Sequence, residues 1–113
     1  MKSEHLYSEA SRENAEMRAS ATPEIIDAWR NFSRTVFKDG ALDGKTKQLI
    51  AVAVAHVTQC PYCIHSHTEH ALRKGATKEE IMEAIWVAAE MRAGAAYAHS
   101  ALAMDEILAV EKK

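Results

Sequence analysis

Residues 44–67 read GKTKQLIAVAVAHVTQCPYCIHSH, an alanine-rich run that leads directly into a Cys-Pro-Tyr-Cys motif. Residues 50–55 alternate as a strand would, and periodicity alone does not separate a strand from a buried helix here. No glycine or proline interrupts the run between Gly44 and Pro61, and alanine is the best helix former. We therefore predict a helix over 44–58, and with it an all-α fold.

The next helix begins at the motif itself. Proline is favoured at the first helical position, so Pro61 opens this helix, Cys60 lies near its N-cap, and Gly75 closes it. Similar start and stop signals predict a single domain of about six helices, in which Gly94 allows a break between the last two. The helices are expected over residues 3–19, from Pro23 to Asp39, over 44–58, from Pro61 to Gly75, from Thr77 to Gly94, and over 95–110.

The composition predicts a small domain that associates with copies of itself. The chain has 113 residues, about one domain, and its 48% hydrophobic and 27% charged residues are typical of a packed core rather than disorder. Alanine supplies 21 of the hydrophobic residues and aromatic residues make up only 6%, so each residue buries little apolar area. The helix that starts at Thr77 is apolar nearly all round, as in helices buried between subunits. We expect a homo-oligomer.

Charge and hydropathy exclude several classes of partner. The net charge is −2 and no basic stripe is present, which counts against nucleic acid. The longest apolar run, residues 49–55, is far shorter than the roughly 20 residues of a membrane span. The first residues form a polar stretch with no apolar signal segment. We therefore expect a cytoplasmic protein with no nucleic-acid or membrane partner, in a compartment that keeps thiols reduced.

The Cys60 and Cys63 pair is the strongest functional signal. At the start of a helix, unpaired backbone N–H groups and the helix dipole stabilise a thiolate, and one helical turn brings the two sulfurs within reach of a disulfide. His67 lies four residues after Cys63 on the same helix face, where an imidazole can take the thiol proton. Counting about 1.5 Å per residue from the preceding turn places Gln48 roughly 15 Å deep and His67 roughly 10 Å deep. A line from Gln48 through His67 to the two sulfurs is then geometrically reasonable.

Other interpretations of these side chains stay open. Cys60, Cys63, His67 and one more histidine could hold zinc, although their crowding on one helix end and the lack of a second Cys-x2-Cys or His-x3-His pair argue against a metal. Tyr62 can shape access to the sulfurs or simply pack, and His99, in the alanine-rich last helix, is a further candidate for the relay. The remaining histidines in this region are expected to be structural or solvated: His56, His65 and His70.

The same segments resemble a known family. The sequences KTKQLI at 45–50, CPYCIHSH at 60–67 and GATKEEI at 75–81, with the alanine-rich stretch that follows, are similar to the carboxymuconolactone decarboxylase superfamily. Within it, they look like the alkylhydroperoxidase D-like (AhpD-like) branch. The resemblance covers roughly residues 22–108, and we expect one such domain over residues 1–113. It implies an all-helical fold that assembles as trimers or hexamers, and we expect no cofactor and no metal.

The resemblance also implies a thiol peroxidase or disulfide reductase. By that resemblance Cys63 is the thiol that attacks a hydroperoxide and becomes a sulfenic acid. Cys60 is the proton donor and resolving thiol, and His67 belongs to the proton relay. The family's relay glutamate is Gln48 here, and Tyr62 stands where alkylhydroperoxidase D has a histidine. Both changes weaken the relay, because an amide neither accepts a proton nor stabilises an imidazolium as a carboxylate does.

These observations predict a thiol-dependent hydroperoxidase or disulfide oxidoreductase. Its cysteine pair passes through sulfenic acid and disulfide states, and a dithiol or a lipoylated protein is the expected reductant. Lactone decarboxylation is not expected, because the decarboxylases of the superfamily lack the cysteine pair. The alternative hypothesis is a helical oligomer whose cysteines sense redox state or bind a partner without turnover.

Overall fold

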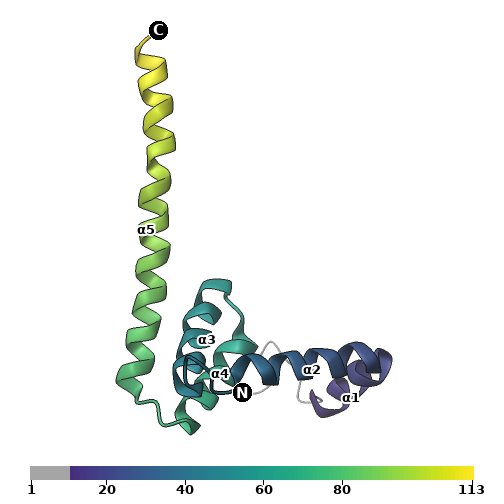
Figure 1. Cartoon of the computed structure of the whole chain (residues 1–113). Helices are drawn as coiled ribbons and strands as arrows, with labels where there is room; N and C mark the ends of the chain where they lie inside the picture. The colour runs from purple at the N-terminus through teal and green to yellow at the C-terminus, as the bar shows by residue number, and fades with distance from the viewer. Residues whose placement is uncertain (1–10) are drawn as a thin grey trace. The chain divides into compact units, whose positions relative to one another are not determined.

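The computed structural model describes residues 11–113, and these residues form five helices and no strand (Figure 1). The all-α prediction is therefore confirmed for them. The chain divides into two compact units, one that ends at Lys38 and one that begins at Asp39. The cysteine motif belongs to the second unit.

The first unit contributes α1 (Ser11–Ala21) and α2 (Pro23–Phe37). The predicted start of α2 is confirmed, because proline occupies its first turn, although the Thr22 side chain makes no capping hydrogen bond. Of the helix expected over residues 3–19, residues 3–10 lie outside the described part of the chain.

The second unit is built from α3 (Gly44–Thr58), α4 (Pro61–Arg73) and α5 (Lys78–Glu111). In this unit α3 lies against both α4 and α5 (Figure 1). The core of this unit combines alanines with larger aliphatic side chains. Its buried members are Val52, Ala71, Ala76 and Ile81, with Leu49 and Ile85 packed against them.

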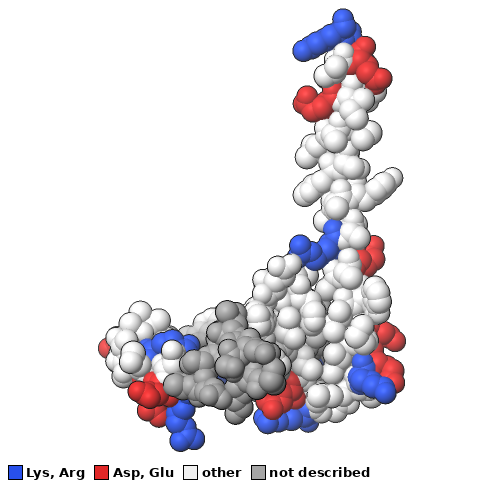
Figure 2. Space-filling model, turned by 180° about the vertical axis from the view of Figure 1, so that it is seen from behind, with Lys and Arg blue, Asp and Glu red and all other residues white. Residues whose placement is uncertain are grey.

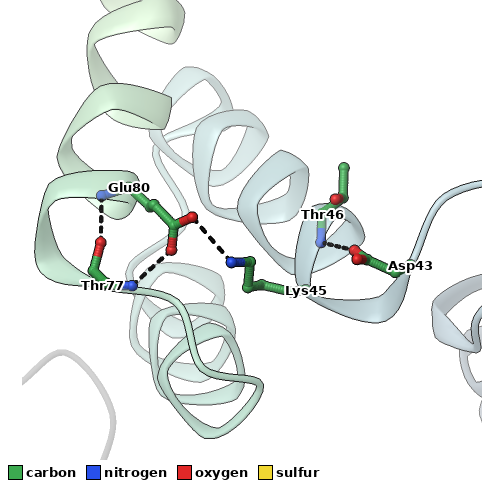
Figure 3. A network of polar contacts seen from close by, with 5 residues as sticks. All are labelled: Asp43, Lys45, Thr46, Thr77 and Glu80. Carbon is green, nitrogen blue, oxygen red and sulfur yellow. Dashed lines mark hydrogen bonds and ion pairs between the residues drawn. The ribbon is translucent and has the colours of Figure 1, made fainter.

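Side chains at the starts of α3 and α5 cap their own helices, and an ion pair joins the two helix starts (Figure 3). The side chain of Asp43 accepts the N–H of Thr46 at 2.8 Å and so caps the start of α3. The capping box of α5 is also present: Thr77 accepts the Glu80 N–H at 3.0 Å, and Glu80 accepts the Thr77 N–H at 2.9 Å. The same carboxylate pairs with Lys45 at 2.9 Å. The backbone N–H of Thr77, and then Lys45, hold the pKa of Glu80 below its ordinary value.

The break expected at Gly94 is wrong, and the last two predicted helices are one helix. The helix α5 runs without interruption for 34 residues, or about 51 Å. A glycine inside a helix costs only about 1 kcal/mol relative to alanine, so the alanines around Gly94 carry the helix through it. A glycine ends a helix when it adopts a positive φ, as Gly75 does after α4 with φ of 90°. The described chain therefore has five helices rather than about six.

The C-terminal half of α5 extends beyond α3 and α4 (Figure 1). Residues 93–104 contain no Lys, Arg, Asp or Glu, and Figure 2 shows this part of the helix without those charges. Tyr97 and Leu102 are 82% and 67% exposed. Within the chain, the buried residues of α5 are Ile81 and Ala88, and the expected burial between subunits stays a prediction. In the part of the chain that is described, no helix is long and apolar enough to cross a bilayer.

Candidate active site

The turn between α3 and α4 places the cysteine motif. The carbonyl of Ala55 accepts the N–H groups of both Gln59 and Cys60, the latter at 3.2 Å. Gln59 adopts the left-handed conformation that commonly ends a helix, with φ of 59° and ψ of 47°. The chain reverses there, and Cys60 becomes the N-cap of α4 with Pro61 directly after it. The predicted position of the motif at a helix start is confirmed.

The two cysteines lie together at this helix start. The sulfur of Cys60 accepts the backbone N–H of Cys63 at 3.2 Å, in the manner of an N-cap side chain. The sulfurs of the two cysteines are also in contact, with their Sγ atoms 2.6 Å apart. Both cysteines are free thiols and both are half-buried. The sulfurs are therefore near enough to react with each other and are not sealed from solvent.

These hydrogen bonds make the two thiols unequal. The pKa of Cys60 is lowered, first by its side-chain hydrogen bond with Cys63 and then by the backbone N–H of Cys63. The pKa of Cys63 is raised, first by its side-chain hydrogen bond with Cys60 and then by burial, which disfavours its charged form.

A histidine and a buried amide lie behind the pair. The Nδ1 atom of His67 donates to the Oε1 atom of Gln48 at 2.7 Å, which joins α4 to α3. The Gln48 side chain is only 6% exposed, so the amide holds the imidazole at a fixed place. With Nδ1 protonated, the neutral ring carries its lone pair on Nε2. Burial, and then the nearby His70, lower the pKa of His67, so the ring is neutral and able to take a proton at neutral pH.

The same residues lie within a stretch that matches a known family. The family model for the carboxymuconolactone decarboxylase family matches residues 23–106. The chain belongs to this family. The family suggested by the cysteine motif is thereby confirmed, together with its all-α fold.

Three relatives of this family member illustrate the likeness. A Paracoccus denitrificans protein, uncharacterized protein 4 in the cox locus, is 71% identical over 86 residues, which cover 74% of this chain and 78% of that protein. A solved structure from Methanobacterium thermoautotrophicum is 36% identical with a TM-score of 0.70, and the match covers 74% of this chain and 93% of that one. A Thermotoga maritima family protein, for which involvement in an antioxidative response has been suggested, is 31% identical with a TM-score of 0.62 over 69% and 67% of the two chains.

Two further residues predicted to support the relay are Tyr62, between the cysteines, and His99, on α5. Tyr62 follows Pro61 but is 63% exposed. His99 is exposed in the C-terminal half of α5, about 10 Å further along the helix axis than Arg92. Within the chain, Gln48 contacts His67 and Cys60 contacts Cys63, and His67 follows Cys63 by about one turn of α4.

The other histidines have structural contacts or face solvent. His56 and His70 each donate through Nδ1 to a carbonyl four residues earlier, at 2.8 Å and 2.7 Å, and His65 is exposed. Among residues 11–113, no three His, Cys, Asp or Glu side chains are grouped so that they could hold a metal ion.

The contact made by Arg92 was not predicted from the sequence. Its Nη1 atom donates to the carbonyl of Val57 at 2.8 Å, and so satisfies one of the last carbonyls of α3. The guanidinium thereby holds α5 against the helical turn that precedes Gln59 and Cys60. The two partners are 35 residues apart, so no local pattern could have indicated the contact.

The neutral His67 predicts a pH-dependent loss of stability. Its pKa lies below the ordinary value of 6.5 in the folded chain, so the unfolded chain binds a proton first as the pH falls. Well above the ordinary pKa, His67 is neutral in both states and does not change the free energy of unfolding. As the pH falls from the ordinary pKa through the folded pKa, His67 lowers the free energy of unfolding. Between about pH 7 and about pH 5.5, we expect a smaller drop in melting temperature for His67→Gln than for the unmodified protein. Equal drops in both proteins would show that His67 is not held neutral.

Proposed function

We propose that this family member is a dithiol oxidoreductase that reduces hydroperoxides with its cysteine pair. The observation that carries the proposal is the 2.6 Å contact between the Cys60 and Cys63 sulfurs at the start of α4. A thiol with a second thiol in contact can be oxidised and then protected as a disulfide before further oxidation occurs. The antioxidative response suggested for the Thermotoga maritima relative supports the same chemistry.

The proposed reaction begins from the pair with both thiols protonated. The Nε2 atom of His67 takes the proton of Cys63, and the resulting thiolate attacks the hydroperoxide. A sulfur–oxygen bond forms, the oxygen–oxygen bond breaks, and the departing alkoxide takes the proton of Cys60 to leave as an alcohol. The Cys60 thiolate then attacks the sulfenic sulfur of Cys63. The disulfide forms and hydroxide leaves, taking the proton from His67 to become water.

Gln48 limits the rate of this sequence rather than preventing it. Its amide oxygen holds His67 in the tautomer that leaves Nε2 as the base. Because an amide carries no charge, it does not stabilise the imidazolium that forms when His67 takes the proton. We therefore propose slow proton transfer and correspondingly slow turnover.

An external dithiol completes the proposed cycle. A dithiol reductant, either a small molecule or a lipoylated protein, attacks the Cys60–Cys63 disulfide, leaves as its own disulfide and restores both thiols. We propose a cytoplasmic setting for this cycle, where the ambient reductants keep the pair reduced between turnovers.

Turnover with a dithiol reductant tests the proposal. With excess hydroperoxide and dihydrolipoamide, each protein molecule is expected to consume many equivalents of peroxide, and alcohol is expected to appear in step with oxidised lipoamide. If the protein forms one intramolecular disulfide and consumes no more than one equivalent with any dithiol, it is a redox sensor rather than a peroxidase.

We also propose that the chain works as a homo-oligomer, a trimer or a hexamer. The exposed apolar side chains on the C-terminal half of α5 favour association, because burying them removes a large apolar area from water. Sedimentation at micromolar concentration is expected to give a mass several times that of one chain. Leu102→Glu, which places a charge on this surface, is expected to shift the mass towards the monomer. A stable monomer in the unmodified protein would contradict the proposal.

A further inference from the structure

A row of large apolar side chains runs along one face of α2. Ile25, Trp29 and Phe32 recur at intervals of four and three residues, which places them on the same side of the helix. They are 69%, 59% and 59% exposed, and the ring centroids of Trp29 and Phe32 are 5.8 Å apart. We call these three residues the α2 seam. Apolar residues at this spacing are typical of a helix face that packs against another helix.

The first unit does not bury the seam itself. None of the three seam residues lines the hollow between α1 and α2, whose α2 side consists of Pro23, Ile26, Asp27 and Arg30. Among residues 12–38, no side chain is buried. A helix of 15 residues is only marginally stable by itself in water. The seam therefore requires a surface from outside this unit.

The charges of α2 indicate what kind of surface fits the seam. With about 3.6 residues per turn, the charged residues of α2 all lie on the sides away from the seam; they are Glu24, Asp27, Arg30 and Arg34. Because they carry both signs, they favour neither an anionic membrane surface nor nucleic acid. The surface that complements the seam is an apolar protein surface without charge.

The C-terminal half of α5 offers such a surface. Residues 93–104 contain no Lys, Arg, Asp or Glu, and Tyr97 and Leu102 are 82% and 67% exposed. This stretch is about 18 Å long, the same length as residues 25–36 of α2, which contain the seam. The two helix segments can therefore pack side by side over their whole length without burying an unpaired charge.

The exposed apolar area is large enough for a stable interface between copies of the chain. A large apolar side chain at this exposure offers roughly 100 Å², so the seam offers roughly 300 Å² and the ten such side chains of α5 roughly 1,000 Å². A standard interface buries about 800 Å² on each partner. Within the described chain only six hydrophobic residues are buried, and four of them are alanines. The chain thus has ample area for an interface and a small core of its own.

We propose that the α2 seam of one copy packs against residues 93–104 of α5 in a second copy. This inference rests on the proposed association, and it assigns to that association a surface in the first unit and the segment that this surface contacts. Each chain presents both surfaces, so the contact is heterologous and closes into a ring when the rotation between neighbouring copies allows it.

Photo-cross-linking between isotopically distinct copies tests the contact directly. The full chain with Phe32→p-benzoylphenylalanine is unfolded and refolded, under reducing conditions, together with unmodified chain labelled with the heavy nitrogen isotope. After irradiation and trypsin digestion, the light peptide with position 32 is expected to be joined to the heavy peptide of residues 93–112. A cross-link to another segment, or one found only between peptides of the same isotope, would overturn the proposal.

Trp29 provides a second measurement without a foreign side chain. Trp86→Phe leaves Trp29 as the one tryptophan of the chain, and the proposed contact buries it. Quenching of its fluorescence by acrylamide is expected to become at least about threefold stronger when Leu102→Glu is added. Equal quenching with and without Leu102→Glu would overturn the proposal.

Phe32→Glu and Asn31→Glu form a matched pair of variants on α2, both made in the Trp86→Phe protein. Each introduces one carboxylate at an exposed position, but only Phe32 belongs to the seam. Phe32→Glu should open Trp29 to acrylamide and lower the sedimenting mass, whereas Asn31→Glu should do neither. Equal effects of the two variants would contradict the contact. Circular dichroism checks that each variant is folded.

The possible failures are distinguishable from one another. An oligomer in which Trp29 stays open to acrylamide would overturn this inference alone, whereas a stable monomer would overturn the proposed association as well. Because none of these measurements uses a hydroperoxide, their results are independent of peroxide turnover.

Discussion

Cys63→Ser is expected to lower the rate of hydroperoxide consumption at least about 100-fold, because a serine hydroxyl is a far weaker nucleophile than a thiolate at neutral pH. The backbone N–H at position 63 still donates to the Cys60 sulfur, so the start of α4 and the fold should be preserved. The measurement is loss of hydroperoxide in the presence of excess dihydrolipoamide, compared with the unmodified protein at equal concentration.

Cys60→Ser is the matched comparison for that experiment. It leaves the attacking thiol in place and removes the resolving one, so without dihydrolipoamide it should consume about one equivalent of peroxide and stop at the sulfenic acid of Cys63. A sulfenic-acid trap such as dimedone should label Cys63 in this variant. Full turnover in Cys63→Ser, or no labelling of Cys63 in Cys60→Ser, would contradict the proposed role of Cys63 in peroxide reduction.

Gln48→Glu is expected to raise the turnover number about tenfold. A carboxylate 2.7 Å from Nδ1 would stabilise the imidazolium of His67, and general acid–base catalysis is worth about 100-fold or more when the base is well matched. The effect should appear in kcat and in its pH profile, where the ionisation assigned to His67 moves to higher pH. Burial of the new carboxylate next to an imidazole also predicts a lower melting temperature at alkaline pH, where His67 is neutral.

Two controls separate this effect from a general change in charge. Asn31→Asp makes the same amide-to-carboxylate change at an exposed position of α2 and should leave turnover unchanged. Gln48→Leu removes the hydrogen bond to His67 and should lower turnover about tenfold at every pH. If Gln48→Glu and Gln48→Leu both leave turnover unchanged, position 48 is structural and takes no part in the relay.

Much of the second unit follows from local sequence signals. Asp43, Pro61 and Thr77 mark the starts of three helices, and each signal acts within one helical turn of the residue that carries it. The contact between Gln48 and His67 could also be predicted, because the rise per residue of two antiparallel helices places the two positions within about 5 Å of each other in depth.

The features that local signals could not predict have physical reasons of two kinds. Gly94 is a weak breaker, and the cost of about 1 kcal/mol is smaller than the propensity of the surrounding alanines to remain helical. The hydrogen bond from Arg92 to Val57 joins residues 35 positions apart and appears only when α5 is placed beside α3. The opposite pKa shifts of Cys60 and Cys63 depend on the hydrogen bonds and the burial of each sulfur, which the spacing of the motif alone does not determine.

The central claim is that the two sulfurs at the start of α4 react with each other after one of them meets a hydroperoxide. The most direct test is the mass of the peptide containing Cys60 and Cys63, measured without reductant before and after one equivalent of hydroperoxide. We expect this peptide to become lighter by two hydrogen atoms and to stop reacting with a thiol-alkylating agent. A peptide of unchanged mass with two alkylatable cysteines, or one that has only gained oxygen, would contradict it.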